Sequence, residues 1–351
     1  MPRGIDLNGY VYRLISVVNR IDLPYSKIND GDIHNLTDIL ASLLLIGMQD
    51  VTKYGLKRAY DIETVTVNKV RGKILFGKSV STGALARGQL VCEVNQLRDD
   101  NVFNQTLKYA ITLLLRPSKR DRESCRLSSV KAGKLSYYRQ TLHEVRDSAR
   151  VSGREFILRK APFYYQFALR VAFLIIDLYT GFSKDGRARL SSLGEYERCT
   201  AVFEKYIRYM LGLPTGAKRA HLSYEDEDGI ECFYPDMIVY RHEENKAIAL
   251  DVSWVDKSRR VNIRRGHQYN TLHYEELVNQ EYPDYKVARA IVFADLFGES
   301  EYSEYSSDHK YNSLTGTHEF YLYLNNRDET IQKTLARMID GLFDDMNRRG
   351  Y

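Results

Sequence analysis

The fold of the second half of this chain is decided by one stretch, YPDMIVYRHEENKAIALDVSWVDK, from Tyr234 to Lys257. Residues 237–240 and 247–252 are rich in Ile, Val, Leu and Ala, and the polar run Arg241–Lys246 separates them. Two apolar runs joined by a short polar break predict a β-hairpin.

The register of this hairpin predicts a pair of acids. With the turn centred between Glu243 and Glu244, Asp236 lies directly opposite Asp251. Directly opposed residues have Cβ atoms about 4.5–5.5 Å apart, and two carboxylates that close repel unless a cation lies between them. Carboxylate oxygens suit Mg²⁺ and Mn²⁺, so the hairpin predicts a divalent metal site made by Asp236 and Asp251.

Pro235-Asp236 on one strand and Asp251 on the next resemble the frame of the PD-(D/E)xK nucleases. In that chemistry the acids hold a metal that activates water, and a lysine two residues after the second acid helps position or deprotonate it. This chain has Ser253 at the lysine position. The alternative interpretation is a hairpin that carries two acids at its solvated end.

Glu204, in VFEKYIRYML, is a third candidate for the site. A helix predicted over about 196–213 enters the same sheet and adds this carboxylate to the metal site. The alternative is an ordinary surface pair with Arg208, four residues further along the helix.

A cluster of cations follows the second strand, in KSRRVNIRRGHQYN. Cations beside a phosphodiester site are what binding to the DNA backbone needs, whereas a generic charge run more often forms a solvated face. The candidate DNA-binding residues are Lys257, Arg259, Arg260, Arg264 and Arg265.

A competing motif lies in the first half, in RGKILFGKS. Gly72, Gly77, Lys78 and Ser79 fit the phosphate-binding loop G-x-x-x-x-G-K-[ST]. A true phosphate loop lies between a buried strand and a helix that begins directly after it. The residues that follow are poor helix formers, so we interpret the match as accidental and keep nucleotide binding as the least favoured alternative.

The bulk composition bounds the class of protein. The chain has 351 residues, a net charge of +5, 44% hydrophobic and 28% charged residues, which is typical of a globular protein of about two domains. Its four cysteines form no C-x-x-C pair, and its most apolar helix candidate contains polar residues. We therefore expect a cytoplasmic protein with no membrane segment.

The order of elements predicts an α/β (α+β) protein of two domains. The composition becomes small, polar and basic in GFSKDGRARLSS, which places the boundary there and gives domains 1–185 and 186–351. After the helix and the hairpin, the second domain continues with a helix near Gln268–Val278, a strand at Ala288–Ala294, a strand at Glu319–Leu324 and a long helix from Glu329.

Most of the chain resembles the McrC family, the nuclease subunits of McrBC-type, 5-methylcytosine-specific restriction systems. In the first half the resemblance lies in YGLKRAY, KVRGKI and LVCEVNQLRDDNVFNQTLKYAI. Within the last stretch Cys92, Glu93, Leu97, Asn104, Leu107 and Lys108 fit the family pattern, while Asn95 and Gln96 replace its usual acids. In the second half VFEKYI, Pro235-Asp236, ALDVSW and the SRR of Ser258–Arg260 fit its nuclease domain.

This resemblance implies a division of labour between two proteins. The N-terminal mixed α/β domain would bind a hexameric McrB-like AAA+ GTPase by inserting into its ring, and this chain itself would bind no nucleotide. The C-terminal PD-(D/E)xK domain, a mixed sheet flanked by helices, would cut double-stranded DNA that carries methylated cytosine. Because the family has lysine where this chain has Ser253, the alternative is a catalytically degenerate, non-enzymatic subunit that couples the motor to DNA.

Overall fold

The chain divides into two compact units in the computed structural model. One unit combines residues 1–27 with 193–351, and the other spans 28–192. The expected domains 1–185 and 186–351 differ from these units mainly in the first 27 residues, which cluster with the C-terminal part of the chain. The structure describes residues 7–28, 33–116, 127–148, 153–182, 188–190, 195–213, 222–226, 229–233, 236–254, 260–295, 307–313, 316–324 and 327–348.

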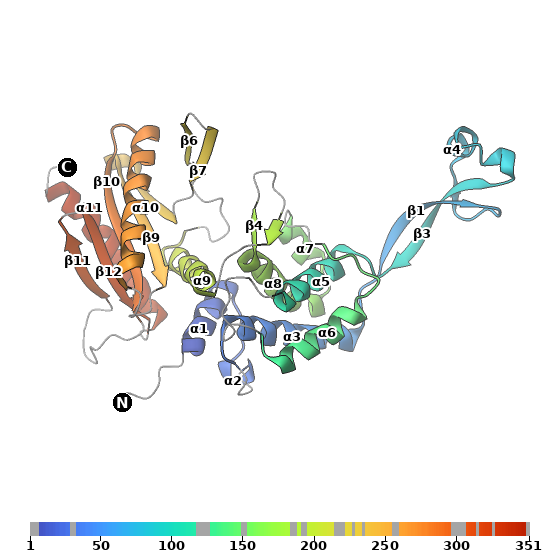
Figure 1. The fold of residues 1–351 in the computed structure, drawn as a ribbon, viewed down its shortest axis with the longest axis horizontal. Coiled ribbons are helices and arrows are strands. Elements are labelled where there is room, and N and C mark those ends of the chain that lie inside the picture. The colour runs from blue at the N-terminus through green and yellow to red at the C-terminus, as the bar shows by residue number, and fades with distance from the viewer. Residues whose placement is uncertain are drawn as a thin grey trace. The chain divides into compact units, whose positions relative to one another are not determined.

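The first unit is built on a five-stranded mixed sheet with strand order β11-β12-β10-β9-β8 (Figure 1). The outer pairs β8–β9 and β11–β12 are antiparallel, and the inner pairs β9–β10 and β10–β12 are parallel. The mixed α/β fold predicted from the sequence is therefore confirmed. The elements of this unit are α1 (Leu7–Asn19), α9 (Glu195–Met210), β6 (Leu222–Asp226), β7 (Gly229–Phe233), β8 (Met237–Arg241), η3 (His242–Glu244), β9 (Lys246–Trp254), α10 (Arg260–Glu281), β10 (Lys286–Asp295), β11 (Ser307–Asn312), β12 (Thr317–Tyr323) and α11 (Asp328–Arg348).

Strand β9 is an inner strand of this sheet, between β10 and β8, and every one of its residues is buried. Burial of successive residues means that both faces of the sheet are covered, because neighbouring side chains on a strand point to opposite faces. On one face Ala247 packs with Leu277 and Val278 of α10. On the other face the guanidinium group of Arg241 lies 4.2 Å from the ring centre of Phe343 in α11.

The N-terminal helix α1 is bound to the C-terminal unit through Asp328, at the start of α11. Arg13 of α1 donates to the Asp328 carboxylate over 2.6 Å and to the carbonyl oxygen of Leu324 over 2.9 Å. The Tyr206 hydroxyl of α9 donates to the same Asp328 oxygen over 2.6 Å. These contacts join α1, α9 and α11, and they explain why the first residues of the chain fold with its last ones.

The second unit is a group of packed helices from which a β-hairpin extends. Helix α8 packs against both α3 and α5. The contact of α3 with α8 is close, since a Cβ on Gly47 would lie 2.7 Å from the Cα of Ala168. The elements of this unit are α3 (Leu36–Tyr54), β1 (Ala59–Val67), β2 (Lys73–Ile74), α4 (Phe76–Ser81), η1 (Leu85–Arg87), β3 (Leu90–Arg98), α5 (Val102–Leu115), α6 (Ser129–Thr141), α7 (Arg154–Lys160), α8 (Phe163–Tyr179), β4 (Thr180–Phe182) and β5 (Ala188–Leu190), while α2 (Tyr25–Ile28) crosses the boundary between the units in sequence.

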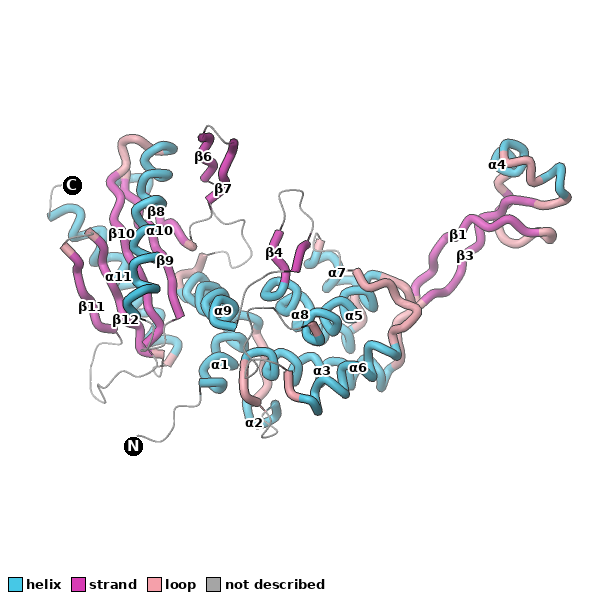
Figure 2. Tube along the Cα trace, in the orientation of Figure 1, coloured by secondary structure: helices cyan, strands magenta, loops and turns pink. Residues whose placement is uncertain are grey.

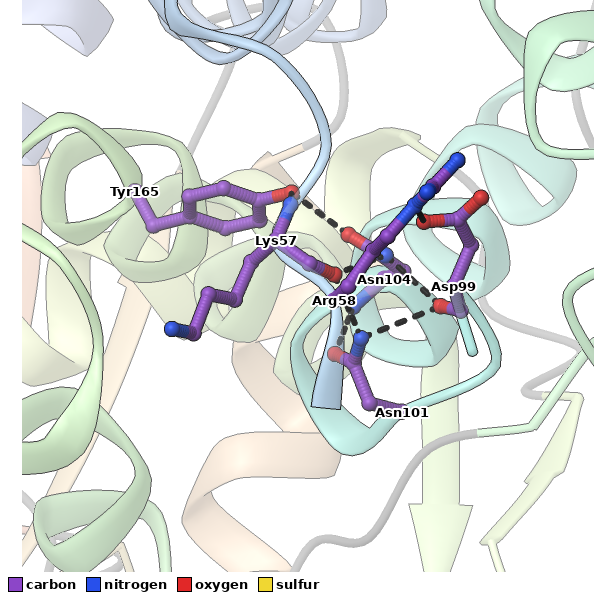
Figure 3. A network of polar contacts seen from close by, with 6 residues as sticks. All are labelled: Lys57, Arg58, Asp99, Asn101, Asn104 and Tyr165. Atoms are coloured by element: carbon purple, nitrogen blue, oxygen red, sulfur yellow. Dashed lines mark hydrogen bonds and ion pairs between the residues drawn. The ribbon is translucent and has the colours of Figure 1, made fainter. Parts of the chain in front are cut away.

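We call residues 59–98 the arm. Strands β1 and β3 pair from Ala59↔Arg98 to Val67↔Leu90, and Figure 2 shows them running together from the helices of this unit to the end that carries α4. A network of polar contacts fixes the base of the arm to α5 and α8 (Figure 3). Asn104 of α5 donates to the carbonyl oxygen of Lys57 over 3.0 Å and accepts from the Tyr165 hydroxyl over 2.6 Å.

The same network bonds to the residues that flank both strands of the arm. Tyr165 accepts from the backbone N–H of Lys57 over 2.8 Å, and Asn104 also donates to the carbonyl oxygen of Asp99 over 2.7 Å. The residues just before β1 and just after β3 are therefore held by one pair of buried side chains. Burial raises the pKa of the Tyr165 hydroxyl, so it remains a neutral hydrogen-bonding group at any ordinary pH.

The segment that matches the phosphate-binding loop has a different conformation. Lys78 and Ser79 lie within the six-residue helix α4, whereas a phosphate loop would place them at the start of a helix. The Ser79 hydroxyl donates to the carbonyl oxygen of Leu75 and accepts from the backbone N–H of Val91. Gly72 has φ +77° and packs against the Glu93 carbonyl, so its glycine is explained by the turn itself. The motif is structural here, and the absence of nucleotide binding stays a prediction.

Across the described part of the chain, we find no helix that is both long enough and apolar enough to span a bilayer.

Candidate active site

The hairpin at the centre of the candidate site has the register predicted from its turn. Strands β8 and β9 pair from Arg241↔Lys246 to Met237↔Leu250, and the next position along places Asp236 opposite Asp251. Asn245 has φ +51°, which closes the turn after η3. The two acids that the sequence singles out are therefore brought to one end of the same hairpin.

Asp236 lies just before strand β8, and its side chain bonds to a backbone group of β9 that β8 does not reach. Strand β8 begins at Met237, so the backbone N–H of Val252 points past the end of its partner strand. The Asp236 carboxylate accepts this N–H over 2.9 Å. Two residues further along, the N–H of Trp254 donates to the Thr200 hydroxyl of α9 over 3.4 Å. The backbone N–H groups of β9 near this end therefore bond both to Asp236 and to α9.

Asp251 is a carboxyl group with only 1% of its surface exposed. Burial, together with the charge of nearby Glu204, raises the pKa of Asp251 to about 7, although hydrogen bonds with Asp236, Val252 and Asn270 act in the opposite direction. The structure therefore brings Asp236, Asp251 and Glu204 close enough to influence one another. A pKa near neutrality in such a group is typical of catalytic and metal-binding carboxylates.

Asn270 of α10 is a site residue that the sequence did not indicate. Its side-chain amide hydrogen-bonds to Asp251. The predicted helix began at Gln268, so Asn270 fell on its first turn with nothing to assign it a face. Helix α10 begins at Arg260 and packs on β9 and β10, and Thr271, next to Asn270, is fully buried. A prediction in which the helix began about two turns earlier would have been needed to assign Asn270 to the face that meets the hairpin.

Glu204 projects from the face of α9 that also carries Thr200 and Arg208. The Nε of Arg208 lies 3.0 Å from a carboxylate oxygen of Glu204, and their side chains are only 10% and 9% exposed. The spacing correctly predicted the pair, but the pair is buried and does not lie on the surface. Arg208 thus adds one cation to the group of carboxylates formed by Asp236, Asp251 and Glu204. Removing either Arg208 or Glu204 would leave the charge of the other buried and uncompensated.

Ser253 lies on the same face of β9 as Asp251 and is completely buried. Lysine 246, at the start of the strand, cannot substitute for the motif lysine, since its ammonium group bonds to Glu244 and to Asn347.

Of the five predicted DNA-binding residues, three lie in a described helix and two do not. Lys257 and Arg259 lie outside the described residues. Arg260, Arg264 and Arg265 lie in the first two turns of α10, the helix that contributes Asn270. Their contact with DNA stays a prediction.

The donor set fits a hard divalent cation. Asp236 and Asp251 offer carboxylate oxygens of the kind that Mg²⁺ and Mn²⁺ prefer, and burial, together with the charge of Glu204, raises the pKa of Asp251. Within the described ranges no three His, Cys, Asp or Glu side chains form a ready ligand set. Glu204 is turned toward Arg208, so two carboxylates plus water are what the site would offer a metal.

Comparison with known proteins points in one direction. Residues 11–282 match the model of a family described as "McrBC 5-methylcytosine restriction system component". One curated relative, the "Type IV methyl-directed restriction enzyme EcoKMcrBC" of Escherichia coli (strain K12), is 28% identical over 86 residues, which are 24% of this chain and 25% of the relative. The aligned part is thus about a quarter of that relative.

Two solved assemblies from Thermococcus gammatolerans contain similar chains. One is a half-complex of a tetradecameric assembly of McrB AAA+ hexamers with bound McrC, with a TM-score of 0.41, 15% identity, and coverage of 93% of this chain and 76% of that chain. The other is the McrBC complex determined by cryo-electron microscopy, with a TM-score of 0.39, 14% identity, and coverage of 62% and 61%.

Proposed function

The chain belongs to the family of McrBC 5-methylcytosine restriction system components, and from this we propose that it is the McrC-like subunit of a modification-dependent restriction complex. In this proposal it is a Mg²⁺-dependent DNA endonuclease of the PD-(D/E)xK type. It works with an McrB-like AAA+ GTPase hexamer, which it stimulates and which drives it. The substrate is double-stranded DNA that carries methylated cytosine.

One observation carries the nuclease assignment: two carboxyl groups, Asp236 and Asp251, are forced together across the end of a β-hairpin. A directly opposed pair of carboxylates, one of them buried, destabilises a sheet unless a cation offsets it. A hairpin that merely ended in solvated acids would leave Asp251 exposed, whereas Asp251 is 1% exposed. Burial therefore favours the metal site over the solvated-acid alternative.

The residues of the site have separate roles in this proposal. Asp236 and Asp251 would hold Mg²⁺, which when bound supplies Lewis-acid stabilisation of the phosphodiester and a more acidic water. Asn270 orients Asp251 through its amide. Arg208 fixes the carboxylate of Glu204 and offsets its charge. The cations of the segment 257–265 would bind the phosphates that flank the scissile bond.

A specific observation also supports the second candidate, a non-enzymatic subunit that couples the motor to DNA. Ser253 stands where the PD-(D/E)xK frame has lysine, and a buried serine hydroxyl carries no charge to the attacking water. Loss of a general acid–base group typically lowers a rate by about 10²–10⁴-fold. The site could then bind metal and DNA and cut slowly or not at all.

Cleavage of methylated plasmid DNA separates the two candidates. The full chain is incubated with Mg²⁺, with and without an McrB-like partner and GTP, and with unmethylated plasmid as control. The endonuclease proposal predicts cuts that need the chain, the partner, GTP and methylation together. If Mg²⁺ and DNA bind but the plasmid stays intact under every condition, the non-enzymatic candidate is correct.

The arm is the part of the N-terminal unit that we propose contacts the AAA+ partner. Tyr60 and Leu97 are directly opposed on one face of the strands, and Ile62 follows on the same face; their exposed fractions are 77%, 50% and 65%. Phe76 in α4, at the far end, is 65% exposed. Large apolar side chains gathered on a soluble protein mark an interaction surface. The fixed base of the arm, through Asn104 and Tyr165, means that such a surface is presented in one orientation.

Replacing Phe76 by alanine is expected to reduce stimulation of the partner's GTPase by about 10-fold or more, because exposed aromatic side chains are frequent binding hot spots. Phe156→Ala on α7 is the matched control, since Phe156 is 58% exposed in the same unit but lies outside the arm. The measurement is GTP hydrolysis as a function of the concentration of this chain. Equal stimulation by both variants would show that the end of the arm is not the contact.

A further inference from the structure

A pair of histidines lies on the antiparallel hairpin β11–β12, away from the acids of the candidate active site in sequence and on the opposite edge of the sheet. Nε2 of His309 and Nδ1 of His318 are 3.0 Å apart. The two residues are diagonal neighbours, because His309 is opposite Phe320 and His318 is opposite Tyr311.

Each ring is held by its directly opposed neighbour. His309 stacks on Phe320 with ring centres 4.6 Å apart, and His318 packs on Tyr311 at 4.7 Å. The two imidazole planes differ by only 7°. Rings fixed in this way bring their nitrogens together before any ligand arrives, so little conformational entropy remains to be lost on binding.

We propose that His309 and His318 form a binding site for a divalent transition ion that favours imidazole, such as Zn²⁺ or Ni²⁺. Two nitrogens bound to one tetrahedral zinc ion at about 2.0–2.1 Å lie roughly 3.3 Å apart, so a shift of about 0.3 Å from the present separation suffices. His309 is exposed, which gives the ion access and leaves positions for water, while His318 is buried and fixed.

The other nitrogen of His318 faces a carboxylate. Nε2 of His318 lies 3.8 Å from a carboxylate oxygen of Asp345 in α11. At this distance the carboxylate acts on the imidazole through its charge, which favours a proton on Nε2 and so directs the Nδ1 lone pair toward His309. The chemistry of this site differs from that of Asp236 and Asp251, since imidazole favours Zn²⁺ and Ni²⁺ whereas carboxylate oxygens favour Mg²⁺.

The test is isothermal titration of the full, EDTA-stripped chain with Zn²⁺ in an excess of Mg²⁺, which occupies hard-oxygen sites. The site predicts saturable binding that His309→Gln weakens by about 10-fold or more, and that Asp345→Asn weakens by about 10-fold. His143→Gln is the matched control: its imidazole also neighbours a carboxylate, with Nε2 of His143 3.6 Å from Glu144, but it is 72% exposed and no described histidine faces it.

The position of His309 makes the test secure, because an exposed residue can be replaced without loss of the fold, whereas His318 is buried. Retained Zn²⁺ affinity in His309→Gln overturns the proposal. So does an equal loss in His143→Gln, which would mark the binding as general adsorption to surface histidines.

Discussion

Replacing Asp251 by asparagine is expected to lower the rate of DNA cleavage by on the order of 10³-fold or more, which is the effect of removing one essential electrostatic group from a metal-assisted reaction. Asparagine has nearly the same shape and still accepts a hydrogen bond, but it brings no negative charge to the metal. Asp251 is buried within β9 with Asp236, Glu204 and Asn270 near it, so bulk solvent does not compensate for the lost charge.

The measurement is the rate of plasmid cleavage by the full complex at saturating Mg²⁺. Asp344→Asn, an exposed acid on α11, serves as the control and should cleave at the wild-type rate. GTPase stimulation by Asp251→Asn should be unchanged, since the arm lies in the other unit. Cleavage by Asp251→Asn at a rate close to wild type would remove Asp251 from the chemistry.

The second large effect is on stability in the absence of metal. The pKa of Asp251 is about 7 in the folded chain against an ordinary value of 3.8. Between these two values the folded state binds a proton that the unfolded state does not, so the free energy of unfolding falls as the pH rises from about 4 to 7 and levels off above 7. The difference between a pKa of 3.8 and one of about 7 corresponds to about 4 kcal/mol in the free energy of unfolding.

Asparagine at position 251 is never charged, so the Asp251→Asn variant escapes this loss. In EDTA it is expected to be more stable than wild type near pH 8, by up to about 4 kcal/mol, and this advantage should disappear near pH 4. Excess Mg²⁺ should restore the stability of the wild type alone, because only the carboxylate pair binds the ion.

Trp254 provides a local probe for this measurement. It is the only tryptophan in the sequence, it lies three residues after Asp251 on β9, and its ring packs against Phe203 of α9. Urea unfolding followed by its fluorescence therefore reports on the unit that holds the site. Asp344→Asn is again the control. A wild-type chain that is as stable at pH 8 as Asp251→Asn in EDTA would mean that Asp251 is not a strained, buried charge.

The hairpin and its register could be predicted from the sequence because they depend on local information. The polar turn and the two apolar strands are contiguous in the sequence. Because side chains alternate between the two faces of a strand, a slip of one residue would move every side chain to the wrong face, so the register is fixed. This local rule placed Asp236 opposite Asp251 without knowledge of the rest of the fold. The helix that carries Glu204 followed from its apolar periodicity in the same way.

Burial and distant packing could not be predicted from the sequence. The spacing of Glu204 and Arg208 predicts that they pair, but only the packing of α9 against β9 makes the pair buried. The docking of α1 through Arg13 and Asp328 joins residues that are 315 positions apart, and no local pattern encodes it. For the same reason Asn270 was missed, because its face depends on how α10 lies over the sheet.

The phosphate-loop motif shows the opposite case, in which a matching pattern meets the wrong structural context. Gly77, Lys78 and Ser79 are in the pattern, yet they lie inside α4, and the Ser79 hydroxyl bonds to the backbone. Similarly, Asn104 was noted only because it fits the family pattern, whereas in the structure it holds the base of the arm. A motif gains meaning only from the elements on either side of it.

Asp236 and Asp251 should act together on one cation, and Mn²⁺ binding tests this most directly. Titration of the full, EDTA-stripped chain with Mn²⁺, followed by the electron paramagnetic resonance signal of the free ion, counts the bound metal. We predict one Mn²⁺ site in the wild type and in Asp344→Asn, lost in both Asp236→Asn and Asp251→Asn. Unchanged Mn²⁺ binding in those two variants would contradict the account.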